Sequence, residues 1–342
     1  MTFELGVYSF GNTPRLADSR RGPTAQAVRD VLEAIRLADD VGLDYFGVGE
    51  HHMRAMPLSS PTSVINAAAA STQRIKLSTA VSVLSTDDPI RVFQQLATAA
   101  AIAPGRIETV AGRGSSTITF PLFDHGEHDY DMLYASKLEL LMAINAGENV
   151  SFDGPHRKRP LQNATVFPRP EEPLKIWLGT GGSPDSVYRA VELGLPMFLG
   201  ILGGTPEHWA QYGRAYRAAW AQASHPVDQA DIAVAVHGFV ADTGDKARAT
   251  YLEYEHRMMA ELGRPAPPRA DRAAPLGPGG MVFAGSPDEI ADRILHLHGL
   301  LGHTRQILQM DVGGMPHRDY LRASELLGTK VLPQIRTELA SR

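Results

Sequence analysis

Cysteine is absent from the 342-residue sequence. Disulfide bonds, thiolate nucleophiles and cysteine-ligated zinc sites are therefore excluded. An excess of basic residues is also absent, because 33 lysines and arginines stand against 38 aspartates and glutamates, giving a formal net charge of −5. Proteins that bind nucleic acids usually carry a basic balance, so we expect no nucleic-acid partner.

Long apolar runs are missing as well. No run approaches the ~18 residues that a membrane-spanning helix needs. Residues 1–8 show neither the basic region nor the long apolar region of a secretory signal. We therefore expect a cytoplasmic protein without a membrane contact. Apolar residues make up 43% and charged residues 21% of the chain, which suits a globular protein with a large core.

Short apolar segments alternate with amphipathic segments of helical periodicity along the chain. The expected strands are 5–8, 45–48, 75–84, 107–111, 175–179, 196–202, 232–240 and 306–312. The expected helices are 25–41, 61–71, 89–103, 130–146, 185–193, 207–223, 246–262, 287–300 and 320–339. Apolar strands that are each followed by a helix predict a parallel sheet covered on both faces. The predicted fold class is α/β, a (β/α)8 TIM barrel with loop insertions, formed by residues 1–342 as one domain.

Two stretches interrupt the alternation. Residues 149–173 are rich in proline, arginine and lysine, and they predict an insertion with short strands. Residues 263–286 predict a second insertion, because they open with a proline-rich segment at 263–280. Long loops inside compact domains are usually functional or mobile, so we expect this loop to cover the mouth of the barrel.

Three polar residues, Glu50, His51 and His52, follow the second expected strand. Functional groups of such barrels lie at the C-terminal ends of the strands, and an imidazole suits proton transfer near neutral pH. These residues are therefore the candidate catalytic groups. In extended backbone the two imidazoles point to opposite sides, so at most one faces the cavity. The alternative is that Glu50 and one histidine are buried and hold the loop by bonding to each other.

A glycine-rich turn, Gly181, Gly182 and Ser183, follows the fifth expected strand and opens a helix. Backbone N–H groups at such a helix start bind anions when small residues allow close approach, which predicts a phosphate site. The alternative is a tight turn capped by Ser183 or Asp185. Pro184 occupies the place of the third glycine in a G-x-G-x-x-G fingerprint, so no Rossmann-type nicotinamide site is indicated.

Further candidates lie at the ends of the third and fourth expected strands. Arg113 stands between two glycines, where it suits a phosphate or a flavin carbonyl, or alternatively a buried structural ion pair. At Ala80, Val81 and Ser82 a flat ring could lie against the backbone. A polar cluster at 125–129 is interpreted as a capped, solvated turn, and no metal ligand is assigned.

Taken together, these motifs resemble the luciferase-like flavin monooxygenases, which include bacterial luciferase and alkanesulfonate monooxygenase. The similarity runs along nearly the whole chain. It is carried by residues 50–52, 78–91, 104–106, 111–114, 181–183, 192–196 and 285–287.

The resemblance implies FMN at the C-terminal mouth of the barrel, and a homodimer. It also implies a cis peptide between Ala80 and Val81 beneath the isoalloxazine ring. Arg113 and residues 181–183 match positions that hold the FMN phosphate, and His51 matches an active-site histidine. Luciferases carry a second arginine near the start of the fourth helix, where this sequence has Asp131, so we expect the phosphate contacts to be redistributed.

The leading hypothesis is an FMN-dependent monooxygenase. Reduced FMN from a separate flavin reductase would react with O₂ to give a flavin C4a-peroxide, which oxygenates a small organic substrate. The protein would position the reactants and exclude water, and His51 would exchange a proton. One alternative is hydride transfer with a deazaflavin; others are a metal-dependent barrel hydrolase using His51, His52, Glu127 and His128, and a non-catalytic flavin-binding protein.

Overall fold

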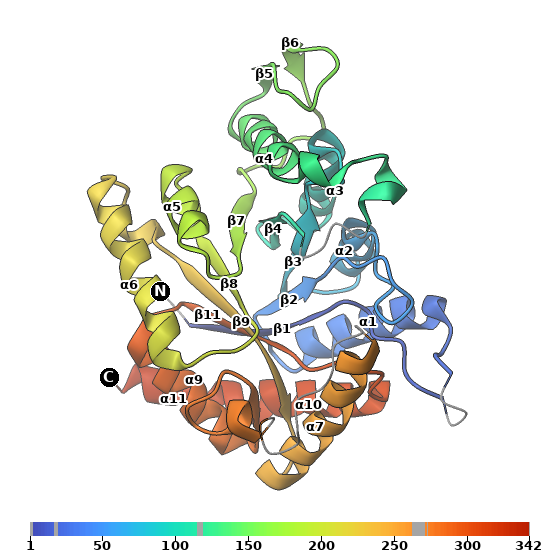
Figure 1. The fold of residues 1–342 in the computed structure, drawn as a ribbon, viewed down its shortest axis with the longest axis vertical. Coiled ribbons are helices and arrows are strands. Elements are labelled where there is room, and N and C mark those ends of the chain that lie inside the picture. Colours follow the sequence, from blue (N-terminus) through green and yellow to red (C-terminus); the bar gives the residue numbers. More distant parts are fainter. Residues whose placement is uncertain (1–2, 17–19, 115–118, 262–270, 272, 342) are drawn as a thin grey trace.

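The computed structural model describes residues 3–16, 20–114, 119–261, 271 and 273–341. Within this part, eight parallel strands form a closed barrel in the order β1-β2-β3-β4-β7-β8-β9-β11, with β11 paired to β1 (Figure 1). They are β1 (Glu4–Ser9), β2 (Tyr45–Val48), β3 (Lys76–Val83), β4 (Ile107–Gly112), β7 (Lys175–Thr180), β8 (Met197–Ile201), β9 (Ile232–Val240) and β11 (Arg305–Gln309). The predicted TIM barrel is confirmed, and each expected strand overlaps an observed one.

Helices surround the strands (Figure 1). The α-helices are α1 (Thr24–Asp40), α2 (Pro61–Ala69), α3 (Pro89–Ile102), α4 (Tyr130–Ala146), α5 (Pro184–Glu192), α6 (Pro206–Gln222), α7 (Gly244–Glu261), α9 (Pro287–Leu301), α10 (His317–Leu326) and α11 (Leu332–Ala340). Short 3-10 turns are η1 (Phe120–Phe123), η2 (Glu127–Asp129), η3 (Val227–Gln229) and η4 (Ala274–Leu276). Among the described residues, no helix is long and apolar enough to cross a membrane.

The helix expected at 320–339 is interrupted. It begins earlier, at His317, and a π-helical turn, η5 (Leu327–Val331), separates α10 from α11. Pro333 has no backbone N–H to donate to the carbonyl of Thr329, so the regular hydrogen-bond ladder cannot continue there. The single expected helix therefore becomes two joined segments.

Both expected insertions contain strands. In the first, β5 (Asn149–Phe152) and β6 (Leu161–Thr165) form an antiparallel hairpin that projects from the barrel (Figure 1). In the second, β10 (Phe283–Gly285) pairs with β9 in parallel. The sequence did not predict β10, because this stretch was expected to be irregular. Residues 263–270 and 272 of the expected covering loop, and residue 262 at the end of the helix expected before it, lie outside the described residues. The assignment of residues 1–342 to one domain stays a prediction.

Side chains fill the barrel interior unevenly. The interior cluster contains Tyr8, Tyr45, Ala80, Val110, Trp177, Phe198, Ala233, Ala235 and Ile307. Alternate residues of a strand share a face. Two positions beyond Tyr45, Val110, Trp177 and Phe198, toward the mouth, stand Gly47, Gly112, Gly179 and Gly200. The interior is thus packed with bulky side chains below, whereas four strands contribute none near the mouth.

An ion-pair network closes the opposite end of the barrel. Arg305 donates to both carboxylate oxygens of Glu108, at 2.6 and 3.1 Å, and the Trp177 indole donates to the same carboxylate at 2.8 Å. Burial alone would raise the pKa of Glu108, but Arg305 lowers it to about 2. The buried charged groups at this end of the barrel are therefore paired with one another and have a structural role. Groups that could bind a ligand or react lie at the mouth.

Candidate active site

The structure brings the predicted site segments together. Residues 50–52 follow β2, residues 80–82 end β3, Arg113 follows β4, and the turn at 181–183 follows β7. These four strands are successive neighbours in the barrel, so the segments share one half of the mouth. We call this half the β2–β7 arc; the other half, formed by β8, β9, β11 and β1, is the β8–β1 arc.

Glu50 and His52 belong to the wall of the mouth. The His52 Nε2 atom lies 3.0 Å from Glu50 Oε1, and the backbone N–H of Val83 donates to Glu50 Oε2 at 3.0 Å. Burial raises the pKa of Glu50, while the bonds from Val83 and His52 oppose the rise. The pair therefore ties the loop after β2 to the end of β3, as in the structural alternative considered from the sequence.

His51 occupies a different environment. Its ring packs against the Phe10 ring with a centroid distance of 4.6 Å, and Phe10 in turn contacts Tyr8 of the interior cluster at 5.6 Å. Burial lowers the pKa of His51, and the neighbouring His52 lowers it further. The imidazole is therefore neutral at pH 7 and able to accept a proton. One histidine lies in the wall and the other beside the interior side chains, consistent with the alternation expected for extended backbone.

The end of β3 has an unusual backbone. The peptide between Ala80 and Val81 is cis, as the family resemblance implies. Ala80 belongs to the interior cluster, and a Cβ at Gly112 would lie only 2.3 Å from a Val81 methyl group. Ser82 is 2% exposed and its hydroxyl donates to Thr79 at 3.0 Å. Ala80 and Val81 therefore contribute to the inner surface, whereas the Ser82 hydroxyl is engaged in the wall.

Arg113 forms an exposed ion pair rather than the buried one considered from the sequence. Its Nη1 atom lies 2.6 Å from Asp131 Oδ1, and its guanidinium lies 4.6 Å from the centre of the Tyr130 ring. The two charged side chains are 46% and 76% exposed. Partial burial would lower the pKa of Arg113, but the Asp131 carboxylate raises it above its ordinary value. The arginine is a solvent-accessible cation at the rim.

The glycine-rich turn caps α5. Ser183 Oγ accepts the backbone N–H of Ser186 at 3.3 Å. Gly182 has φ +84°, and a Cβ there would lie 2.3 Å from the Trp209 ring, so both backbone and packing require glycine. A Cβ at Gly181 would meet nothing within 4 Å. Ser183 therefore caps the helix, while the backbone at Gly181 faces empty space. An anion could approach the turn from the Gly181 side.

Sequence reasoning overlooked a second arginine near this turn. Arg189 of α5 lies 5.8 Å from the centre of the Tyr134 ring. Burial raises the pKa of Tyr134 to about 12, against the opposing charges of Arg189 and Arg113. Two cations from different elements therefore act on one aromatic ring. The sequence predicted only that Arg189 lies within the helix expected at 185–193, and no pattern in it indicated Tyr134 as a partner.

A second imidazole lies on the β8–β1 arc. His237 shares the interior-facing side of β9 with Ala233 and Ala235, and its Nδ1 atom lies 3.3 Å from the Tyr251 hydroxyl of α7. Burial lowers its pKa to about 4, and Gln309 opposes the shift. His237 lies within the strand expected at 232–240, but only the fold reveals its neighbours.

The metal-hydrolase alternative finds no support in this arrangement. In the described part of the chain, one group of at least three potential metal-ligating residues is found, Asp30, Glu33 and His317. It does not include His51, His52, Glu127 or His128, and the His128 side chain is 86% exposed beside Asp129.

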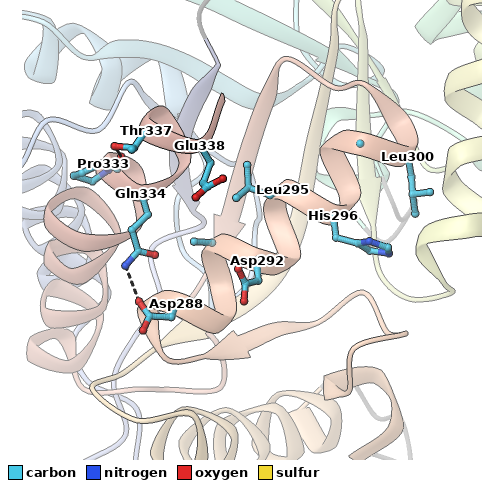
Figure 2. Close-up of a pocket in the computed structure, with 11 residues that line it drawn as sticks. Asp288, Asp292, Leu295, His296, Leu300, Pro333, Gln334, Thr337 and Glu338 are labelled. Atoms are coloured by element: carbon cyan, nitrogen blue, oxygen red, sulfur yellow. Dashed lines mark hydrogen bonds between the residues drawn. The ribbon is translucent and has the colours of Figure 1, made fainter. Parts of the chain in front are cut away.

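A groove outside the barrel is also unconnected with these residues. Figure 2 shows this space of about 990 Å³, whose lining residues all come from α9 and α11. Gln334 of α11 donates to Asp288 of α9 at 2.6 Å across it. No barrel strand contributes to its lining, so the groove is separate from the candidate active site.

Comparison with known families agrees with this architecture. The profile of the luciferase-like monooxygenases, flavin-dependent oxidoreductases, matches residues 13–304. The chain belongs to the luciferase-like monooxygenase family.

Individual relatives are named for different activities. The chain is 32% identical over 164 residues to the F420-dependent glucose-6-phosphate dehydrogenase of Beutenbergia cavernae, covering 46% of this chain and 48%, or about half, of that enzyme. It is 26% identical over 245 residues to the N-acetyl-S-alkylcysteine monooxygenase of Bacillus subtilis, 70% of each chain.

Among solved structures, the oxygenating constituent of 3,6-diketocamphane monooxygenase from Pseudomonas putida, in complex with FMN, has a TM-score of 0.77. The match covers 98% of this chain and 99% of that one at 18% identity, which shows the barrel fold alone.

Proposed function

We propose that this protein is an FMN-dependent monooxygenase that oxygenates a small organic substrate. The observation that carries the proposal is the arrangement on three neighbouring strand ends. β3 presents Ala80 and Val81, β4 presents the Arg113 cation, and β7 presents the open turn at 181–183 that begins α5. An apolar surface beside two groups that can bind an anion suits a flat ring system carrying a phosphate.

The residues fit FMN sterically and electrostatically. Gly112 and Gly179 have no side chain that would press against Val81. A Cβ at Gly112 would lie 2.3 Å from a Val81 methyl group, and a Cβ at Gly179 would lie 3.3 Å from one. Gly181 leaves backbone open beside the start of α5. Arg113 is charged and accessible. In this proposal the ring lies against Ala80 and Val81, and Arg113 and the 181–183 turn hold the phosphate.

Protein groups then have distinct tasks. FMN, when bound, supplies the electron transfer that activates O₂. His51, neutral and packed on Phe10, accepts or returns a proton at its imidazole nitrogen. Glu50 and His52 keep the loop that carries His51 in place. Phe123, whose ring lies 5.2 Å from that of His52, shields the mouth from water.

The proposal extends to partners. A separate flavin reductase supplies reduced FMN, the enzyme works in the cytoplasm as a homodimer, and its substrate is a small molecule.

Hydride transfer with a deazaflavin is the second candidate, favoured by the similarity to the dehydrogenase from Beutenbergia cavernae. Fluorescence titrations with FMN, riboflavin and F420, followed by O₂ consumption with reduced FMN, separate the two. We expect FMN to bind much more tightly than riboflavin, because its phosphate adds charge-assisted hydrogen bonds worth roughly 1.5–3 kcal/mol each. Equal affinity for FMN and riboflavin refutes the phosphate site. Tight binding of F420 without protein-dependent O₂ consumption replaces the monooxygenase with the second candidate.

A further inference from the structure

A cluster of potential metal ligands lies outside the barrel, between the first and last helical units. Asp30 and Glu33 stand one turn apart on α1, and His317 is the first residue of α10, which packs beside α1 (Figure 1). One ligand atom from each residue lies within 4.8 Å of the others. Residues three apart on a helix project from the same face, so both carboxylates face His317.

The spacing within the cluster suits a shared ion. His317 Nε2 lies 3.2 Å from Glu33 Oε2. Two ligands of one tetrahedral zinc ion, each bound at about 2.0–2.2 Å, are separated by about 3.4 Å. The Gln26 amide donates to Asp30 Oδ1 at 2.6 Å, the kind of outer contact that orients a ligating carboxylate. Glu33 is 62% exposed and leaves a path for an ion to enter.

A second observation comes from the space behind the cluster. Asp30 and His317 line a small cavity of about 10 Å³ together with Asp311 and Tyr320. Asp311 is only 7% exposed, and its Oδ2 accepts a hydrogen bond from the Ser9 hydroxyl. Its Oδ1 accepts no hydrogen bond of ordinary geometry from any described residue. The Tyr320 hydroxyl, also buried, makes no hydrogen bond of ordinary geometry within the described part of the chain. Buried polar atoms are normally satisfied, and a polar cavity of this size holds about one water molecule.

We propose that Asp30, Glu33 and His317 bind one divalent transition-metal ion, with Zn²⁺ the best match. Two carboxylate oxygens and one imidazole nitrogen form a ligand set that zinc accepts, with a water molecule completing the tetrahedron. That water donates its hydrogen bond to Asp311 Oδ1 across the cavity. A simple His317–Glu33 hydrogen bond would still leave the buried Asp311 Oδ1 atom without a donor of ordinary geometry among the described residues.

The consequence is structural and independent of the flavin proposal. The ion ties α1 to α10, the helices that follow β1 and β11, where the barrel closes. Asn12 already joins the same two units, since its amide donates to the Met315 carbonyl at 3.1 Å and its side-chain oxygen accepts the Gly314 N–H at 2.8 Å. A ligand that binds only the folded chain raises its thermal stability, so the ion should stabilise this closure.

The test uses the full-length protein after EDTA treatment and desalting. Calorimetric titration with Zn²⁺ and visible absorption during titration with Co²⁺ report binding, and thermal melts report stability. We expect one ion per chain and a higher melting temperature with Zn²⁺. Glu33→Gln, an exposed and nearly isosteric change, should weaken binding by at least about tenfold and remove the thermal shift, and His317→Ala should do the same.

The matched control is His256→Ala, which removes an exposed histidine of α7 outside the cluster and should bind Zn²⁺ as the wild type does. Failure of the wild type to bind one Zn²⁺ or Co²⁺ ion overturns the proposal. So does a Glu33→Gln protein with wild-type affinity and thermal shift, because the ion would then be held elsewhere.

Discussion

Asp131 offers the sharpest test of how the cofactor phosphate is held. Its carboxylate lies 2.6 Å from Arg113, the cation that we assign to the phosphate. Any phosphate that reaches Arg113 must therefore compete with a carboxylate already bonded to it. We predict that Asp131→Asn tightens FMN binding while leaving riboflavin binding unchanged, because only FMN carries the phosphate.

The magnitude follows from the exposure of the pair. An ion pair between side chains exposed by 46% and 76% contributes about 0.2–1 kcal/mol. In Asp131→Asn the phosphate no longer has to break this pair, so the binding free energy of FMN becomes more favourable by that amount. Removing the repulsion between the carboxylate and a phosphate a few ångströms away adds about 1 kcal/mol at most in a water-like dielectric. Together these effects amount to about 0.2–2 kcal/mol, which corresponds to an FMN dissociation constant lowered by about 1.4-fold to 30-fold.

Flavin fluorescence titrations of four proteins provide the assay: wild type, Asp131→Asn, Arg113→Ala and the double variant. Arg113→Ala should weaken FMN by about tenfold or more, and in its absence Asp131→Asn should have a smaller effect. Added salt should reduce the gain, since exposed charges are screened. If Asp131→Asn changes FMN and riboflavin affinity equally, or changes neither, Arg113 is a structural partner of Asp131 and the phosphate site lies elsewhere.

Three further outcomes test other parts of the site. His51→Ala should keep FMN affinity and lower turnover by about 10²–10⁴-fold in steady-state assays; unchanged turnover removes His51 from the mechanism. Because burial holds the pKa of His237 at about 4, below the 6.5 of an exposed imidazole, the unfolded chain binds more protons. The free energy of unfolding should therefore fall by up to about 3 kcal/mol between pH 6.5 and 4 in urea melts, and His237→Gln should lessen this fall. Gly112→Ala forces a Cβ within 2.3 Å of Val81 and should cost about 1–3 kcal/mol, whereas Gly147→Ala, with nothing within 4 Å, should melt close to the wild-type temperature.

The barrel could be predicted because each strand is an apolar run between clear turn and helix signals. Local chemistry also placed helix starts: Asp88 caps α3 by accepting the N–H groups of Ile90 and Arg91 at 2.8 and 3.1 Å, where Asp88 and Pro89 predict a helix start. β10 escaped prediction because it has only three residues and follows a proline-rich segment. Its register beside β9 depends on tertiary pairing rather than on periodicity.

The sequence predicted where the site residues lie along the strands, but not which residues they bond to. Alternation along the strand indicated that His51 and His52 would face opposite ways, yet not which one would bond Glu50, because that depends on where Phe10 and Val83 lie. Likewise, Asp131 was recognised as a departure from the luciferase pattern. Its ion pair with Arg113 depends on the path of the chain from β4 to α4, which no local pattern encodes.

The two arcs of the mouth suggest how cofactor and substrate share the space. The β2–β7 arc carries the Arg113 cation, the open turn at 181–183 and the apolar surface of Ala80 and Val81, so the proposed FMN occupies that side. The β8–β1 arc instead presents Tyr8 of β1 and His237 of β9, whose neutral imidazole lies 3.3 Å from the Tyr251 hydroxyl. A substrate that meets the reactive face of the flavin must then approach this second arc. Differences in substrate among enzymes with this barrel should therefore reside in β8, β9 and β11, while the groups that bind the flavin stay on β3, β4 and β7.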